Sequence, residues 1–301
     1  MDSCDYICPF TIHQNRDVPS DFALPAQLTQ PFAGIFLPQD AAGWLSRPSY
    51  PARILLLKGD DLWIVAHPTA RTSPLRIPLS DLEVLECGRM LLLGWIGLHG
   101  STVKQTLRYN RRDDRTVEAF LSKLKDSWLP HAASAAPAKP SGFGERLNRK
   151  FEWAEKMETD QSDKPVTRFF QPPARHDYRL LLFHYESWSA GDLVALTPRQ
   201  LLWITDRNRG AYEPYGTVSR SVSLSSLLSV RPGLFNNQPN VEIVLRSGQA
   251  WRFPLAAGLE LEARTFAECV QSALPFLNEP GVEGSLTVAP PPPDLRKDEL
   301  R

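Results

Sequence analysis

The two halves of this 301-residue chain resemble each other, and this internal similarity limits the folds that the sequence can adopt. Four short matches occur in the same order, at offsets that drift only between 140 and 146 residues. Self-similarity at a nearly constant offset is the signature of a duplicated structural unit, so we expect two copies of one domain. The matched segments are Leu62–Ile64 with Leu202–Ile204, Leu79–Leu82 with Leu224–Leu227, Leu107–Tyr109 with Trp251–Phe253, and Phe120 and Leu124 with Phe266 and Val270.

Each copy consists of strand-length apolar segments bounded by glycine, asparagine or charged residues. Lys58-Gly59-Asp60-Asp61 is a turn sequence typical of a β-hairpin, and the second copy has a similar signal at Ser247-Gly248. Because Trp63 and Trp203 occupy matched positions, we expect each to fill the core of its copy. The predicted strands lie in a hairpin within 52–68 and in 76–88, 90–100, 102–112, Arg179–Trp188, Asp192–Leu196, Gln200–Asp206, Ser219–Val230, Asn240–Arg246 and Gln249–Leu255.

One amphipathic helix closes each copy. Apolar side chains recur there at intervals of three and four residues, which places them on a single helix face. Asp114 and Thr116 are the expected caps of the first helix. A further helix is predicted before the second copy. The apolar faces consist of Val117, Phe120, Leu121, Leu124 and Trp128, of Leu147, Phe151, Ala154 and Met157, and of Phe266, Val270, Ala273, Leu274 and Leu277.

Antiparallel strands followed by one terminal helix resemble the pleckstrin-homology-like (PH-like) barrel, and most closely its GRAM and bacterial PH branches. Residues Leu196–Asp206 carry the resemblance, because a strand ending in Leu-Thr turns through the basic Arg199 into a second apolar strand. It covers roughly 165–278 and, through the repeat, roughly 40–130. The resemblance implies a mostly β fold (α+β small barrels), with two PH-like antiparallel barrels that are each capped by a C-terminal amphipathic helix.

Composition predicts where the folded parts begin and end. Segments rich in alanine and proline without apolar periodicity are typical of linkers and extended tails. We expect a poorly ordered N-terminus over 1–25, a first PH-like domain over 26–130, an Ala/Pro linker over 131–144, a leading helix with the second PH-like domain over 145–279, and a disordered Pro-rich tail over 280–301.

The charge balance excludes one broad class of partner. The 34 basic and 34 acidic residues give a formal net charge of zero, whereas general nucleic-acid binders carry an excess of lysine and arginine. No segment approaches the ~20 apolar residues that a membrane-spanning helix requires, and the N-terminus lacks the layout of a signal peptide. We therefore expect a cytoplasmic protein with no nucleic-acid partner.

The sequence predicts neither a metal site nor a cofactor. Cys87 and Cys269 lie among apolar residues and are expected to be reduced core thiols. Cys4, Cys8 and His13 form a C-x3-C-x4-H string, but a structural zinc site has four ligands, usually in two closely spaced pairs, and no second pair follows.

Catalytic motifs are also missing, so we expect a protein that is not an enzyme. The sequence contains no nucleophile elbow, no H-E-x-x-H helix and no phosphate-binding glycine loop. Its six histidines are scattered. His99 and His184 lie within apolar strands, where a hydrogen-bonded structural role is the expected one.

Two groups of residues bear on binding. The resemblance implies a phosphoinositide site only where lysine and arginine cluster around the first hairpin. Here that region offers Arg168, Arg175 and Arg179 in one copy and the dispersed Arg47, Arg53 and Lys58 in the other. Arginine with tyrosine is the composition favoured at protein interfaces, although a solvated loop has it too. The candidate interaction surface consists of Arg207, Arg209, Tyr212 and Tyr215.

These observations predict a non-catalytic binding or scaffolding protein with duplicated PH-like domains that recognise a protein or peptide partner. The expected contacts are exposed sheet edges, the loop around Arg207 and the groove beside each capping helix. The alternative is a peripheral membrane or lipid-head-group binding protein, with weak association at a membrane surface.

Overall fold

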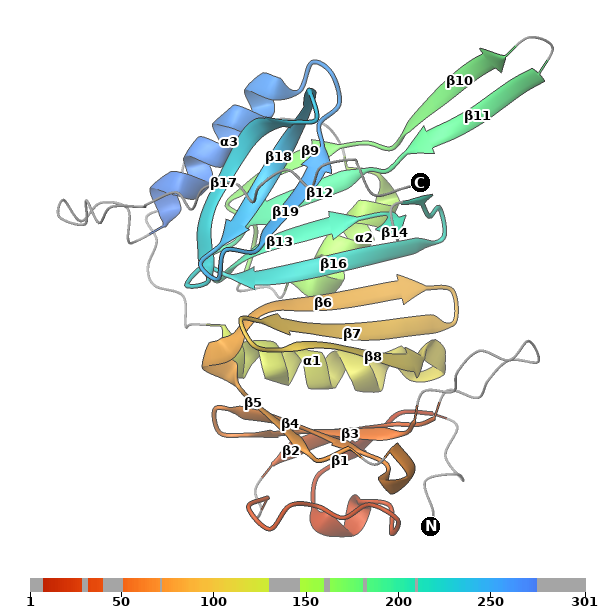
Figure 1. Ribbon diagram of the computed structural model, residues 1–301, viewed down its shortest axis with the longest axis vertical. Coiled ribbons are helices and arrows are strands. Elements are labelled where there is room, and N and C mark those ends of the chain that lie inside the picture. The colour runs from red at the N-terminus through yellow and green to blue at the C-terminus, as the bar shows by residue number, and fades with distance from the viewer. Residues whose placement is uncertain are drawn as a thin grey trace, which may run out of the picture.

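The computed structural model describes residues 8–28, 32–39, 51–70, 72–129, 147–159, 163–180, 183–208 and 211–274 (Figure 1). In these ranges the chain is mostly β, and every strand pairs antiparallel with its neighbour. The predicted mostly β class is therefore confirmed. None of the sheets in the described part of the chain closes into a barrel. No helix there combines the length and apolar content needed to cross a bilayer.

The first half consists of a five-stranded sheet, three further strands and a helix. The predicted hairpin at Lys58–Asp61 is present, and Gly59 adopts a φ of +55° in its turn, a conformation that costs glycine least. The elements are β1 (Phe10–Ile12), β2 (Ala33–Leu37), β3 (Arg53–Lys58), β4 (Asp61–Ala66), β5 (Leu75–Pro78), β6 (Leu82–Met90), β7 (Leu93–Gly100), β8 (Lys104–Asn110) and α1 (Asp114–Trp128).

Apart from β1, which has no counterpart, the second half follows the same order as the first: four strands, three strands and one helix. It adds a leading helix and two inserted hairpins. The hairpin β10–β11 projects from the body, and the shorter β14–β15 lies at the end of β16 (Figure 1). The elements are α2 (Arg149–Glu158), β9 (Thr167–Gln171), β10 (Ala174–Leu180), β11 (Phe183–Ser189), β12 (Asp192–Leu196), β13 (Gln200–Thr205), β14 (Arg207–Asn208), β15 (Ala211–Tyr212), β16 (Gly216–Ser223), β17 (Leu227–Phe235), β18 (Gln238–Leu245), β19 (Ala250–Pro254) and α3 (Glu260–Ala273).

A single seven-stranded sheet joins the two halves. Its order is β8-β7-β6-β16-β13-β12-β9, so β6 of the first half pairs with β16 of the second (Figure 1). The pairing runs from Met90 opposite Gly216 to Val84 opposite Val222. Each of these two strands would otherwise expose an unpaired edge, and mutual pairing covers both edges. The two halves therefore share hydrogen bonds as well as side-chain contacts.

The alternation of side chains along this sheet divides the buried residues between its two faces. On one face, Leu85 and Cys87 pack into the first-half core, between the five-stranded sheet, β6–β8 and α1. On the other face, Val84 packs into the second-half core with Val222 and Trp203. Residue Val84 thus lies in the sequence of the first half but in the core of the second.

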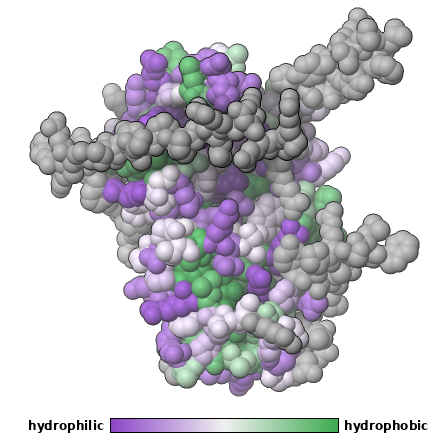
Figure 2. All heavy atoms as spheres, viewed as in Figure 1, coloured by the Kyte–Doolittle hydropathy of each residue, from purple (hydrophilic) through white to green (hydrophobic). Residues whose placement is uncertain are grey.

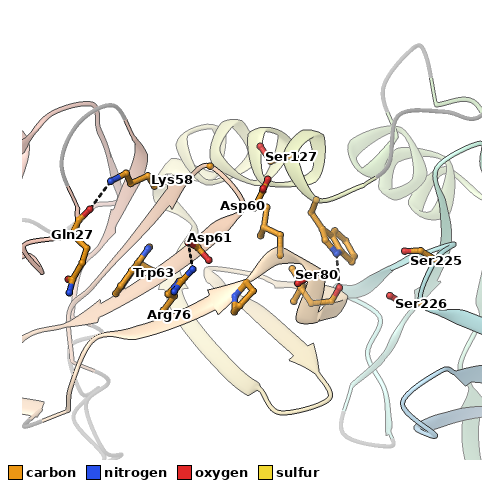
Figure 3. Close-up of a pocket in the computed structure, with 15 residues that line it drawn as sticks. Gln27, Lys58, Asp60, Asp61, Trp63, Arg76, Ser80, Ser127, Ser225 and Ser226 are labelled. Atoms are coloured by element: carbon orange, nitrogen blue, oxygen red, sulfur yellow. Dashed lines mark hydrogen bonds and ion pairs between the residues drawn. The ribbon is translucent and has the colours of Figure 1, made fainter.

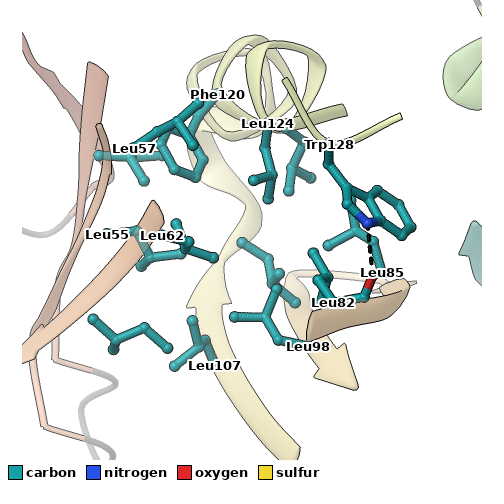
Figure 4. Close-up of a cluster of buried hydrophobic side chains, with 14 of the residues drawn as sticks. Leu55, Leu57, Leu62, Leu82, Leu85, Leu98, Leu107, Phe120, Leu124 and Trp128 are labelled. Atoms are coloured by element: carbon teal, nitrogen blue, oxygen red, sulfur yellow. Dashed lines mark hydrogen bonds between the residues drawn. The ribbon is translucent and has the colours of Figure 1, made fainter. Parts of the chain in front are cut away.

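The first-half core shows how α1 is held (Figure 4). Phe120, Leu124 and Trp128 lie on its buried face as predicted, and the indole nitrogen of Trp128 donates a 2.7 Å hydrogen bond to the carbonyl oxygen of Leu82. The helix begins one residue earlier than the predicted caps suggest. The Asp113 carboxylate accepts bonds from both the backbone and the hydroxyl of Thr116.

Replacing Trp128 by phenylalanine is expected to lower the free energy of unfolding by about 1–3 kcal/mol, because the buried Leu82 carbonyl then loses its donor. Urea unfolding followed by circular dichroism measures this change. The matched control is Trp153→Phe on α2, where the indole is 48% exposed and the cost should stay below about 0.5 kcal/mol. Equal losses in the two variants would contradict the assignment.

Four predicted strands are wrong because each spans a turn, and one of them, 76–88, covers the end of β5, the turn at Leu79–Asp81 and the start of β6. Arg179–Trp188 spans the hairpin β10–β11, and Ser219–Val230 spans the end of β16 and the start of β17. Residues 90–100 contain the β6–β7 turn at Leu91 and Leu92. Apolar or serine-rich sequence continues through these turns, so neither periodicity nor glycine marks them.

In one of the four sequence matches, the matched residues lie on opposite faces of their strands. Leu62 and Ile64 of β4 point into the first-half core, whereas the matched Leu202 and Ile204 of β13 point outward beneath α2. Trp203 fills the second-half core as predicted, but Trp63 does not fill the first. A shift of one residue in a strand exchanges its two faces, so this match is out of register by one position.

Only some of the expected domain boundaries fall on residues that the structure describes. Residues 131–144 and 280–301 lie outside the described residues. The sequence predicts a poorly ordered segment over 1–25, whereas Phe10–Ile12 form β1 and pair with β2. Ile12 and Phe22 belong to a small core on the outer face of the five-stranded sheet. Burial of these apolar side chains stabilises a segment whose local sequence has no periodic signal.

Candidate functional site

An open groove of about 960 Å³ lies where the two halves of the described structure meet (Figure 3). The β3–β4 turn, β5 and the C-terminal end of α1 form one side of it, while Ser225 and Ser226 of the second half lie on the other. Ser127 and Trp128 place this groove beside the C-terminal end of α1.

Three of the four charged side chains that line this groove are engaged within the protein, and the fourth, Asp60, is exposed. Arg76 and Asp61 form a 2.9 Å ion pair across β4 and β5, and the Lys58 ammonium donates a 2.7 Å bond to the Gln27 carbonyl. The remaining polar lining consists mainly of serine hydroxyls, without a histidine beside them. Serine hydroxyls without an adjacent base are not activated nucleophiles, so the groove has no catalytic arrangement among its lining residues.

The second hollow is a cleft of about 470 Å³ on the open face of the seven-stranded sheet. Its floor depends on glycine, because the Trp95 indole lies flat over Gly88, where a Cβ atom would come within 1.9 Å of the ring. We call this hollow the sheet-face cleft. It is lined by Glu86, Met90, Leu93, Trp95, Thr106, Arg108, Arg207, Asn208, Val218 and Arg220, which come from both halves.

Glu86 anchors the middle of the sheet-face cleft. Its two carboxylate oxygens accept 2.8 Å bonds from the Trp95 indole nitrogen and from Nε of Arg220. The Arg220 guanidinium also lies 4.5 Å from the centre of the Trp203 ring. These contacts fix two planar groups in single orientations and neutralise Arg220. The lining still carries three arginines and one glutamate, so the cleft has an excess of positive charge.

Three residues of the predicted interaction surface are described, and of these only Arg207 lines the sheet-face cleft. Its Nε atom is buried and has no hydrogen-bond partner among the described residues. Tyr212 stacks on Trp188 with ring centres 5.7 Å apart, and Tyr215 is 72% exposed in the turn before β16. Arg209 lies outside the described residues. The four residues therefore do not form one continuous patch in the described structure.

The side chains considered for catalysis or metal binding are dispersed. His99 packs edge-to-face on Trp251, and burial lowers the pKa of its imidazole. Burial raises the pKa of the Cys87 thiol to about 12, so the thiol is protonated at neutral pH. In the part of the chain that the structure describes, no three metal-binding side chains lie together; Cys4 is outside that part.

Sequence reasoning missed most of the sheet-face cleft. Glu86, Trp95 and Arg220 lie in separate strands, and their proximity depends on the pairing of β6 with β16. A period-two pattern places each of them on one face of its own strand, but it does not specify which strands are neighbours. A local signal was Glu86, a charged residue between the apolar Leu85 and Cys87.

No protein-family model matches the chain, and a search of the curated proteins likewise finds no match.

Proposed function

We propose that this chain is a non-catalytic binding protein with two PH-like halves, and that it recognises an acidic, extended segment of a protein partner in the sheet-face cleft. The order of four strands, three strands and a helix in both halves supports the PH-like part of the proposal. Three of the sequence matches also support it, because Leu82, Tyr109 and Phe120 face one core while the matched Leu227, Phe253 and Phe266 face the other.

The observation that carries the binding function is the composition of the sheet-face cleft at the junction of the halves. Arg108 and Arg207 add cationic donors on either side of the Glu86–Arg220 pair. Arginine donates paired, charge-assisted hydrogen bonds to carboxylates, and tryptophan and arginine are the side chains that most often dominate binding energy. Because Trp95 is held by Glu86, its ring presents a preorganised apolar surface beside these donors.

Arg207→Glu is expected to weaken binding of an acidic peptide at least about tenfold, since a charged hydrogen bond contributes roughly 1.5–3 kcal/mol. The probe is a fluorescent peptide of alternating glutamate and tyrosine, and fluorescence anisotropy measures its affinity. A peptide of alternating lysine and tyrosine serves as the probe of opposite charge. Arg108→Glu, which changes a different strand, should give a loss of similar size.

The matched control is Arg264→Glu, which makes the same charge change on the exposed face of α3. It should leave the affinity within about twofold, because an exposed charge beyond the Debye length of ~8 Å is screened. An equal loss in Arg264→Glu, or equal binding of the two peptides by the unmodified chain, would remove the basis for the proposal.

Peripheral membrane association is the second candidate function. One feature outside the sheet-face cleft favours it, namely the exposed apolar turn between β6 and β7.

A further inference from the structure

The β6–β7 turn differs in its residue types from three other hairpin turns in the described part of the chain. Hairpin turns are normally built from glycine, asparagine and aspartate, which are polar or tolerate a positive φ. The β3–β4 turn contains Gly59, the turn between β18 and β19 contains Gly248, and the β17–β18 turn contains Asn236-Asn237. The β6–β7 turn instead contains Leu91-Leu92.

Both leucines project into solvent. Leu91 is 66% and Leu92 is 65% exposed, although burial of each side chain would be favourable. Figure 2 shows hydrophobic side chains at the right-hand margin of the molecule, where Figure 1 draws this turn. Tyr215, 72% exposed, precedes Gly216, which pairs with Met90. The register therefore places Tyr215 beside Leu91, and the three side chains form one exposed apolar tip.

The backbone holds this tip in a fixed conformation. Leu91 has a φ of +50°, in the left-handed region that costs free energy for a residue with a Cβ atom. Arg111 secures the turn, because its side chain donates a 3.1 Å bond to the Leu91 carbonyl and its amide donates a 2.9 Å bond to the Leu92 carbonyl. Strain that the surrounding structure maintains is a mark of functional positions.

Cationic side chains lie beside the tip. Asp113 caps α1, Asp114 pairs with Arg111, and the Glu213 carboxylate accepts a 3.2 Å bond from the Tyr215 amide, so these three carboxylates are engaged within the protein. Arg112 and Arg115 are exposed, and neither has an ion pair among the described residues. An apolar tip with an aromatic residue and unpaired cations has the chemistry of a protein surface that enters the head-group region of an anionic bilayer.

We propose that Leu91, Leu92 and Tyr215 insert into the surface of an anionic membrane, while Arg112 and Arg115 contact its head groups. None of the three tip residues lines either hollow. The tip therefore offers no pocket that a side chain of a protein ligand could occupy. A specific protein interface covers roughly 800 Å² on each partner, more than three side chains offer. A bilayer requires no matching shape. This surface goes beyond the peptide-binding function and does not depend on it.

The test is co-sedimentation of the full chain with phosphatidylcholine vesicles that contain or lack phosphatidylserine. The unmodified chain should sediment with the anionic vesicles at low salt and be released at about 0.5 M salt, where charges are screened over a few ångströms. Leu91→Asn combined with Leu92→Gly should reduce partitioning at least about tenfold, because it removes both buried aliphatic groups. Asparagine tolerates the positive φ at position 91 better than leucine does, and glycine is permissive at position 92, so this variant keeps the fold.

Two further variants separate the parts of the proposal. Arg112→Glu with Arg115→Glu should also lower partitioning at least about tenfold, since each arginine near an anionic surface contributes roughly 1 kcal/mol. Arg264→Glu, the same charge change on the exposed face of α3, should leave partitioning within about twofold. The inference fails if the unmodified chain does not sediment at about 1 mM lipid, or if the Asn-Gly variant sediments equally well. It also fails if light scattering shows a dimer that the Asn-Gly variant dissociates, because the tip is then an interface between two copies.

Discussion

Replacing Glu158 by alanine is expected to lower the free energy of unfolding by about 3–5 kcal/mol, because two buried cations lose their counter-charge. Glu158 ends α2 and lies between the halves. Its carboxylate accepts bonds from Arg89 of β6 at 2.5 Å, from Lys125 of α1 at 2.6 Å and from Ser219 of β16 at 2.7 Å. Urea unfolding followed by circular dichroism measures the loss.

The matched control for Glu158 is Glu152→Ala, an exposed carboxylate on the same helix, which should cost less than about 1 kcal/mol. If both variants lose the same stability, the cluster at Glu158 contributes no more than a surface charge does. Glu158→Gln distinguishes charge from packing, since the amide retains the shape but cannot neutralise Arg89 and Lys125.

The effect of Glu158 should also depend on pH. Burial raises the pKa of this carboxyl, but Lys125 and Arg89 outweigh burial and hold the pKa well below its usual range. A carboxyl whose pKa is depressed by folding contributes stability above its unfolded pKa of about 4.3 and loses it as the pH falls through the folded pKa. The difference between the unmodified chain and Glu158→Ala should therefore be constant near pH 7 and shrink below about pH 4.

Val84→Asp is expected to cost about 4 kcal/mol or more and to destabilise both halves together. Val84 is fully buried in the second-half core, although β6 belongs to the first half. A carboxylate there has no partner, so it must either remain charged in an apolar core or take up a proton at a cost in free energy. Hydrogen exchange followed by mass spectrometry reports protection in β3 and β18 separately.

For the Val84 variant, protection should fall in β3 and β18 alike, because the shared seven-stranded sheet couples the halves. The control is Ser101→Asp in the exposed β7–β8 turn, with an expected change within about 0.5 kcal/mol. Loss of protection in β18 alone would show that the halves unfold independently.

Local pattern predicted the elements whose periodicity is strong. The apolar faces of α1 and α2 and the hairpins at Lys58–Asp61 and Ser247-Gly248 were all visible in the sequence, because each depends on residues a few positions apart. The same reasoning failed at Leu91-Leu92, where apolar sequence runs through a turn. Here tertiary contacts, including those of Arg111, hold a conformation that the local residues disfavour.

The candidate site depended on information that no local pattern contains. Arg207 was selected because of its neighbours in the sequence. The residues that line the sheet-face cleft with it include Glu86, Trp95 and Arg220, which lie in strands brought together by the β6–β16 pairing. Tyr212 and Tyr215, selected with it, lie outside the cleft lining. Composition of a loop indicates what it can bind, but only the neighbouring strands determine which of its side chains converge.

The sequence by itself determined that this protein is mostly β and that each half ends in a helix with one buried face. These features follow from periodicity, which acts over a few residues. Only the tertiary structure decided that the halves share one sheet, that Val84 belongs to the other half's core and that Trp63 faces outward. Strand order and register depend on which distant edges pair and which faces find apolar partners, and a one-residue shift reverses every side chain.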